Sequence, residues 1–177
     1  MGLTNPQAAD HIAAEAGTFE PQRANNFSIE IPLSGADKDL IIMGLEGFSL
    51  PQQKNETVTL SYQNEQRKVA GQVSVDEATL TMKDFVDVDT RGAVLRWRKQ
   101  VYDPQTGKIG LAKNYKKTGH VVMTAPDGTS QRVARVIGVW PPADPAIDLK
   151  MEGSEKIMME VPLSVDKIDW SESIVGS

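Results

Sequence analysis

The sequence predicts a mainly β domain with one flanking α-helix, arranged as an antiparallel β sandwich or open barrel. Two segments, "NNFSIEIPL" (25–33) and "EKIMMEVPLSV" (155–165), alternate apolar and polar residues with the period of a half-buried strand. The turn "PDG" (126–128) lies between two strand-like runs and indicates a β-hairpin. Only one stretch, over residues 90–102, spaces its apolar residues as an α-helix does.

A chain of 177 residues is enough for one domain with short extensions. We expect an N-terminal arm over 1–24, a β domain over 25–170 and a C-terminal tail over 171–177. The absence of cysteine excludes disulfides and thiolate metal sites. The sequence shows neither a signal peptide nor a run of about 20 apolar residues, so it predicts no contact with a membrane.

The first strand is expected over 27–33, followed by the turn "SGADKD". The stretch "LIIMGLEGFSL" (40–50) predicts a second strand that is broken at Gly44 or Gly47. Residues 51–70 are polar with a weak strand signal, and they predict either a protruding hairpin or a long loop. The next strand, over 71–85, is expected to be interrupted near residues 76–77.

The single helix is expected at about 90–102, with Asp89 or Thr90 capping its start. Its apolar residues recur at helical spacing: Val94, Trp97 and Val101. The turn "DPQTG" (103–107) ends the helix, and the basic stretch "KIGLAKNYKK" that follows predicts a loop. The hairpin around "PDG" and a final alternating strand bring the expected total to six or seven strands.

Two prolines lie within predicted strands, Pro32 in "IEIPLS" and Pro162 in "MEVPLS". Proline has no backbone N–H to donate to a β ladder, and it is largely confined to edge strands or bulges. We therefore expect both strands at sheet edges, where exposed backbone groups favour pairing with another chain.

Asp84, Asp87 and Asp89 precede the helix, and the spacing of the last two resembles the opening of a calcium-binding loop. Such a loop needs oxygen ligands at its fifth and twelfth positions, which here are Arg91 and Arg98. Two cations would repel calcium. We interpret the aspartates as groups that cap the helix and complement its dipole.

His11 and His120 are the only histidines. Local spacing supports neither a Ser-His-Asp site nor a His-based metal cluster, and "GKIG" lacks the upstream glycine of a phosphate-binding loop. The sequence therefore predicts no catalytic, cofactor-binding or metal-binding residue, and no enzymatic activity.

The basic segment, residues 91–117, has a net charge of +7, whereas the rest of the chain has −12. Its basic residues are Arg91, Arg96, Arg98, Lys99, Lys108, Lys113, Lys116 and Lys117. Three interpretations stay open: a contact between copies of the chain, a solvated face, and a nucleic-acid surface. The acidic remainder opposes the approach of nucleic acid, so we favour self-association.

The proline corner, residues 140–145, follows a predicted strand in "RVIGVWPPADP". We expect Trp140 to end that strand and to anchor the connection. Pro141, Pro142 and Pro145 restrict the backbone, which lowers the entropy lost when the corner is held in place. Together with the basic segment, Trp140, Pro141 and Pro142 are our candidates for a subunit or ring interface.

The order of several motifs resembles the tail tube protein of contractile-tailed bacteriophages. These motifs are "NNFSIEIP", "LRWRKQVYDPQTGKIG", "NYKK" and "GVWP", followed by a loop and a final alternating strand. The resemblance covers about residues 25–170. Tube proteins of type VI secretion and of phage-tail-like injection particles share the same fold.

The resemblance implies a β-sandwich subunit in which six copies form a ring, neighbouring sheets join into an inner barrel, and rings stack into a tube. The 51–70 segment would reach an adjacent ring. Implied partners are further copies, the tail sheath, the tape-measure protein, the baseplate and the tail terminator, with DNA as passing cargo. The implied location is the virion tail, assembled in the bacterial cytoplasm.

The tube function also constrains the basic segment. Contacts between phosphates and cations would hold a sliding DNA strand, so we expect that residues 91–117 do not line the channel as a continuous ring. The rival from another class is a monomeric β-sandwich module that binds a ligand or nucleic acid. A further alternative within the tube class is a subunit of a type VI-like or phage-tail-like injection particle.

Overall fold

The computed structural model describes residues 22–126, 128, 131–149, 151 and 156–170. The predicted C-terminal tail and most of the predicted N-terminal arm, with His11, lie outside these residues. The extents of arm, domain and tail stay predictions.

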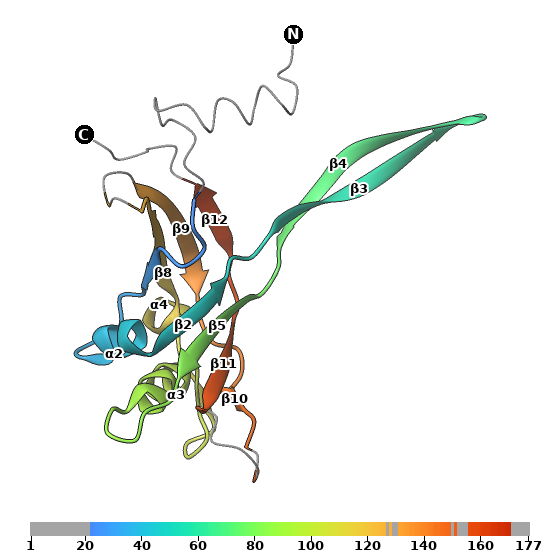
Figure 1. Ribbon diagram of the computed structural model, residues 1–177. Coiled ribbons are helices and arrows are strands. Elements are labelled where there is room, and N and C mark those ends of the chain that lie inside the picture. Colours follow the sequence, from blue (N-terminus) through green and yellow to red (C-terminus); the bar gives the residue numbers. More distant parts are fainter. Residues whose placement is uncertain (1–21, 127, 129–130, 150, 152–155, 171–177) are drawn as a thin grey trace, which may run out of the picture.

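Two four-stranded antiparallel sheets form the body of the domain, as the strand periodicity predicted (Figure 1). The first sheet has the order β1 (Phe27–Glu30), β8 (Lys117–Thr124), β9 (Gln131–Val139) and β12 (Lys167–Trp170). The second sheet has the order β10 (Ala146–Ile147), β11 (Met158–Leu163), β5 (Ala78–Lys83) and β2 (Leu45–Ser49). The hairpin predicted around "PDG" is the β8–β9 pair.

The core lies between the two sheets, because alternate residues of their strands point toward each other. Ile29 and Val121 come from the first sheet, and Leu80 and Val161 from the second, and all four are at most 2% exposed. Helix α3 (Thr90–Val101) packs against the same core and buries Trp97. The predicted helix is therefore present, and its apolar stripe is the face that is buried.

The prediction of a turn and strand over 34–44 is wrong, because helix α2 occupies Asp37–Gly44. Its apolar run contains β-branched isoleucines, which suggested a strand, but Ile41 is buried and the helix packs against α3. Strand β2 begins only at Leu45, and its register shifts before Gly47, one of the two predicted break points. A four-residue helix, α4 (Ala112–Tyr115), also replaces part of the loop predicted after α3.

The segment predicted as a hairpin or a long loop is a hairpin. Strands β3 (Gln53–Tyr62) and β4 (Glu65–Val75) pair with each other and project far beyond the sandwich (Figure 1). The interruption predicted at residues 76–77 separates β4 from β5. A smaller pair, β6 (Tyr102–Asp103) and β7 (Lys108–Ile109), follows α3.

The edge prediction from the two prolines is correct for one strand and wrong for the other. Strand β1, which ends just before Pro32, is an edge of the first sheet. Strand β11, which contains Pro162, lies between β10 and β5. The sheet tolerates this proline because β10 has only two residues, opposite Met159 and Glu160, and Pro162 lies beyond its end.

Candidate assembly surfaces

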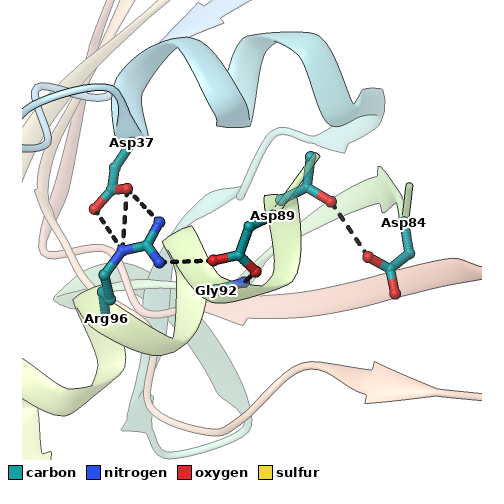
Figure 2. Close-up of polar contacts among 6 residues, drawn as sticks. Asp37, Asp84, Asp89, Gly92 and Arg96 are labelled. Carbon is teal, nitrogen blue, oxygen red and sulfur yellow. Dashed lines mark hydrogen bonds and ion pairs between the residues drawn. The ribbon is translucent and has the colours of Figure 1, made fainter. Parts of the chain in front are cut away.

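The start of α3 shows how the basic segment is held (Figure 2). The Asp89 carboxylate accepts a hydrogen bond from the Gly92 backbone N–H at 2.9 Å and caps the helix. The Arg96 guanidinium donates to Asp89 at 2.8 Å and to Asp37 of α2 at 2.6 Å. The hydrogen bond from Arg96, and next the one from Gly92, lower the pKa of Asp89 below its ordinary value.

Four other basic residues also form ion pairs within the chain. Arg91 pairs with Asp84, Arg98 with Asp144, Lys99 with Asp103 and Lys116 with Asp166. With Arg96, five of the eight predicted interface cations therefore have an acidic partner in the same chain. Lys108, Lys113 and Lys117 form no ion pair with any described residue, so the hypothesis of a contact with an acidic neighbour depends mainly on these three.

Two of the three aspartates before the helix, Asp84 and Asp89, have the structural roles that their position at a helix start indicated, whereas Asp87 is exposed. Asp84 accepts hydrogen bonds from Arg91 and from the Thr90 hydroxyl, and Asp89 is the helix cap. Across the described ranges, no group of three or more His, Asp or Glu side chains could hold a metal ion. None of the helices within those ranges is long and apolar enough to span a membrane.

The proline corner lies against the basic segment. Trp140 follows the last residue of β9 and pairs its backbone with Ser164, by hydrogen bonds of 3.1 and 2.9 Å. Its ring meets the Tyr115 ring edge-on, with 5.4 Å between centroids. Pro141 is buried, and Pro142 is half-buried. Trp140 therefore ends the strand and anchors the corner as predicted, whereas its role as an interface stays a prediction.

The projecting hairpin has one apolar face. Val58, Leu60 and Tyr62 alternate along β3, and Val69 lies directly opposite Val58 on β4. All four are 40–60% exposed. The opposite face carries Thr, Ser, Lys and Gln side chains, among others. Among the residues that the structure describes, no element of the sandwich covers the apolar face, which leaves it open to a partner.

A second apolar surface lies where the two sheets diverge near the base of the hairpin. A cleft of about 250 Å³ opens there, lined mainly by Phe27, Phe48, Leu50, Val121 and Met123. The remaining lining residues are Gln22, Arg23 and Ala24, so the cleft is mostly apolar.

Comparison with solved structures identifies the architecture. The chain matches one from the cryo-EM structure of the PVC sheath-tube complex, an extracellular contractile injection system, with a TM-score of 0.66 and 15% identity, covering 92% of this chain and 96% of that one. This chain has the tube-protein fold of contractile injection systems. A chain from the cryo-EM structure of the PVC sheath/tube terminator also matches, at TM-score 0.65 and 14% identity, covering 87% of this chain and 99% of that one.

A chain from the cryo-EM structure of the anti-feeding prophage cap also matches, at TM-score 0.62 and 14% identity, with 90% of this chain and 97% of that chain covered. No family model and no curated protein matches the sequence. The fold persists at such low identity because the alternation of buried and exposed positions can be kept while the side chains change.

Two surfaces that this tube fold displays were missed from the sequence. The apolar face of the hairpin has a period-two signal at Val58, Leu60 and Tyr62, but this signal is short and lies in a mostly polar segment. Strand β12 was not predicted as a separate edge strand, although Ile168 and Trp170 alternate with Lys167 and Asp169.

Proposed function

We propose that this chain is the structural subunit of the inner tube of a contractile tail or injection apparatus, in which homohexameric rings stack into a tube. The observation that carries the proposal is the extent of the shared fold, which covers 96% and 99% of two chains from sheath-tube and terminator assemblies. A shared fold alone does not determine function. The chain's own surfaces therefore supply the rest of the argument.

The hairpin supports assembly because an isolated two-stranded hairpin is at best marginally stable in water. Here β3 and β4 extend from the sandwich with Val58, Leu60, Tyr62 and Val69 exposed on one face. Full burial of an exposed side chain of this size contributes about 1.5–3 kcal/mol, and these side chains, already partly covered, would contribute about half of that each. A copy in the next ring is the partner we propose for this face, because rings of identical subunits would satisfy every hairpin in the same way.

More specifically, we propose that the tube belongs to a phage tail and passes DNA into the host. It follows from the order of sequence motifs, and it adds the sheath, baseplate, terminator and tape-measure proteins as partners. In this proposal Lys108, Lys113 and Lys117 lie at contacts between subunits or rings and do not form a continuous ring in the channel. A tube subunit needs no catalytic group, and the proposed role is accordingly structural.

Assembly of the purified protein tests the proposal. Light scattering coupled to size-exclusion chromatography should show hexamers or larger species as the concentration rises, and negative-stain images should show rings or rods. A compact monomer at every concentration would overturn the tube proposal and favour a monomeric binding module. Particles isolated from the host distinguish a phage tail from an injection apparatus, because a phage tube is attached to a DNA-filled head.

A further inference from the structure

A β-bulge interrupts the projecting hairpin close to the sandwich. The pairing of the two strands shifts register between Asn55 and Thr57 of β3. At this point the single residue Glu56 faces two residues of β4, Gly71 and Gln72. A bulge of this kind leaves the extra residue outside the ladder of backbone hydrogen bonds, bends the strand and increases its twist. The bulge therefore divides the hairpin into two parts that are not joined by a continuous ladder.

Gly71 lets the two strands approach each other at the bulge. A Cβ added to Gly71 would lie 2.9 Å from the Cγ2 methyl group of Val58 and 3.1 Å from the carbonyl oxygen of Glu56. Glycine within a strand often marks such a bulge or close approach of two backbones. A hollow of about 530 Å³ borders the bulge and is lined by Lys54, Asn55, Glu56, Gln72, Val73 and Ser74. The bulge is therefore not braced by packed side chains on that side.

The part of the hairpin next to the sandwich is fixed in place. Val75 of β4 packs against the core. The Asp76 N–H donates a hydrogen bond to the Gln52 carbonyl at 2.9 Å, and the Lys54 ammonium pairs with the Asp76 carboxylate at 2.5 Å. These contacts involve both strands, so this part keeps its direction relative to the sandwich. We call it the hairpin base, and it comprises residues 53–55 and 73–75.

The part of the hairpin beyond the bulge, the distal hairpin, comprises residues 57–70. All of these residues are exposed. Among the residues that the structure describes, no hydrogen bond or ion pair joins the distal hairpin to the sandwich (Figure 1). Its own strands pair without a register shift, from Thr57 opposite Ala70 to Tyr62 opposite Glu65. The distal hairpin is therefore held together internally and is connected to the rest of the subunit only through the bulge.

We propose that the bulge is a joint, at which the distal hairpin changes direction relative to the sandwich while its two strands stay paired. The apolar face lies wholly beyond the joint, so the movement turns this face as one surface. Its residues are Val58, Leu60, Tyr62 and Val69. In a tube, the joint would let this face meet its partner at more than one angle. That consequence rests on the proposed function, whereas the joint itself is a property of the single subunit.

Distances between spin labels on dilute, monomeric protein test the joint, and the chain has no cysteine of its own to interfere. Ser61→Cys on the distal hairpin and Ser74→Cys on the base are each combined with Glu160→Cys, at an exposed position of β11. Ser61 lies about 17 Å beyond the bulge along the strand. Displacement grows with distance from a joint, so the distribution of distances from position 160 should be at least about twice as wide for Ser61 as for Ser74. Equal widths would overturn the proposal.

Deletion of Gln72 is the decisive variant, because it removes the extra residue and leaves the cross-strand pairs on both sides in place. A continuous ladder should then hold the distal hairpin in one direction, and the width measured at Ser61 should fall to that at Ser74. Gln72→Ala is the matched control, since it keeps the length of β4 and should keep the wide distribution. Urea unfolding shows whether both variants retain the folded sandwich. A width that the deletion leaves unchanged would refute the joint.

A third label pair distinguishes a joint from separation of the two strands. Ser61 lies directly opposite Gln66, so labels on these two positions should stay strongly coupled in the wild type and in the deletion variant. Loss of that coupling in the wild type would show that the distal hairpin opens instead of turning, and it would also overturn the proposal.

Assembly tests the consequence for the tube separately. The deletion of Gln72 should shorten or abolish the rods seen in negative stain, whereas Gln72→Ala should form rods of wild-type length. Rods of normal length from the deletion variant would overturn the role of the joint in stacking. A wild-type protein that never assembles would overturn the proposed tube, but the spin-label distances would still decide whether the joint exists.

Discussion

Trp97 of α3 donates a hydrogen bond from Nε1 to the Tyr115 backbone carbonyl, 2.8 Å away. Because the Tyr115 ring also contacts Trp140, this one bond ties the helix to the proline corner. Trp97 is buried, so removing its donor leaves the carbonyl without that partner inside the protein.

Replacing Trp97 with Phe keeps an aromatic ring in the core but removes the donor. We expect the free energy of unfolding to fall by about 2–4 kcal/mol, from the lost hydrogen bond and the smaller ring. Urea denaturation of dilute, monomeric protein measures this change. Trp170→Phe is the matched control and should cost less than about 0.5 kcal/mol, because Trp170 is exposed in the single subunit. Equal losses in the two variants would contradict the structural role of Trp97.

Gly138 has a φ of +72°, and a Cβ added there would lie 2.1 Å from an Asp166 carboxylate oxygen. Gly138→Ala should therefore cost more than the roughly 1–2 kcal/mol of the left-handed backbone alone. Gly107→Ala is the control, since Gly107 has a φ of +67° and no atom within 4 Å of its added Cβ. The excess cost at Gly138, measured by urea denaturation, should shrink when Asp166 is also replaced by Ala. Equal costs at the two glycines would refute the predicted clash.

The ion pair between Asp89 and Arg96 gives stability a pH dependence. The hydrogen bond from Arg96 lowers the pKa of Asp89 in the folded state below the ordinary value of 3.8. A group with a lowered folded pKa contributes its stability above the unfolded pKa, and loses it as the pH falls through the folded pKa. Asp89→Asn keeps a capping side chain without the charge, so it should destabilise the protein at pH 7 and much less at pH 2.

Unfolding free energies at the two pH values, measured on wild type and variant, check this prediction. Asp87→Asn is the control, since Asp87 is exposed and forms no ion pair with the described residues. A loss of stability that is the same at pH 2 and pH 7 for Asp89→Asn would show that the charge is not the cause.

The strands were predictable from sequence because period-two alternation directly reports a half-buried face. Helix α2 was not, because "LIIMG" has no helical period, and its contact with α3 decides its conformation. The ion pairs of the basic segment between residues far apart in the chain were also beyond reach. Arg96 and Asp37 are 59 residues apart in the chain, and Lys116 and Asp166 are 50 apart. Local sequence patterns therefore revealed the positive charge of the basic segment, but not the distant acidic residues that neutralise part of it.

Substitutions in the proline corner test whether the rigidity of this connection serves folding or assembly. Replacing Pro141, Pro142 and Pro145 with Ser gives the unfolded chain more backbone freedom. This should lower the free energy of unfolding by about 0.4–1 kcal/mol per site. We expect a larger loss in tube assembly, scored as rod length in negative stain, than in the unfolding free energy of the subunit. Because Pro141 is buried, the double variant Pro142→Ser/Pro145→Ser is the control that leaves this position intact. Equal damage to folding and assembly would make the corner only a part of the fold.

The apolar face of the hairpin gives the sharpest test of stacking. Val58→Ser, Leu60→Ser and Val69→Ser, combined, should leave the sandwich folded, because these side chains are exposed and no element of the sandwich covers them. Stacking should weaken by about 2–4 kcal/mol for each hairpin, because each of the three side chains is about half exposed and would contribute about half of the value for full burial. Sedimentation should then show single rings where the wild type forms rods.

The control is on the opposite face of the same hairpin, where Thr57, Thr59 and Ala70 can all be replaced by Ser. These changes alter the same two strands without removing the apolar face, so rods should still form. If this polar-face variant lost stacking and the apolar-face variant kept it, the contact between rings would involve the other side of the hairpin. Loss of the rings themselves in the apolar-face variant would place the hairpin contact within a ring, between neighbouring subunits.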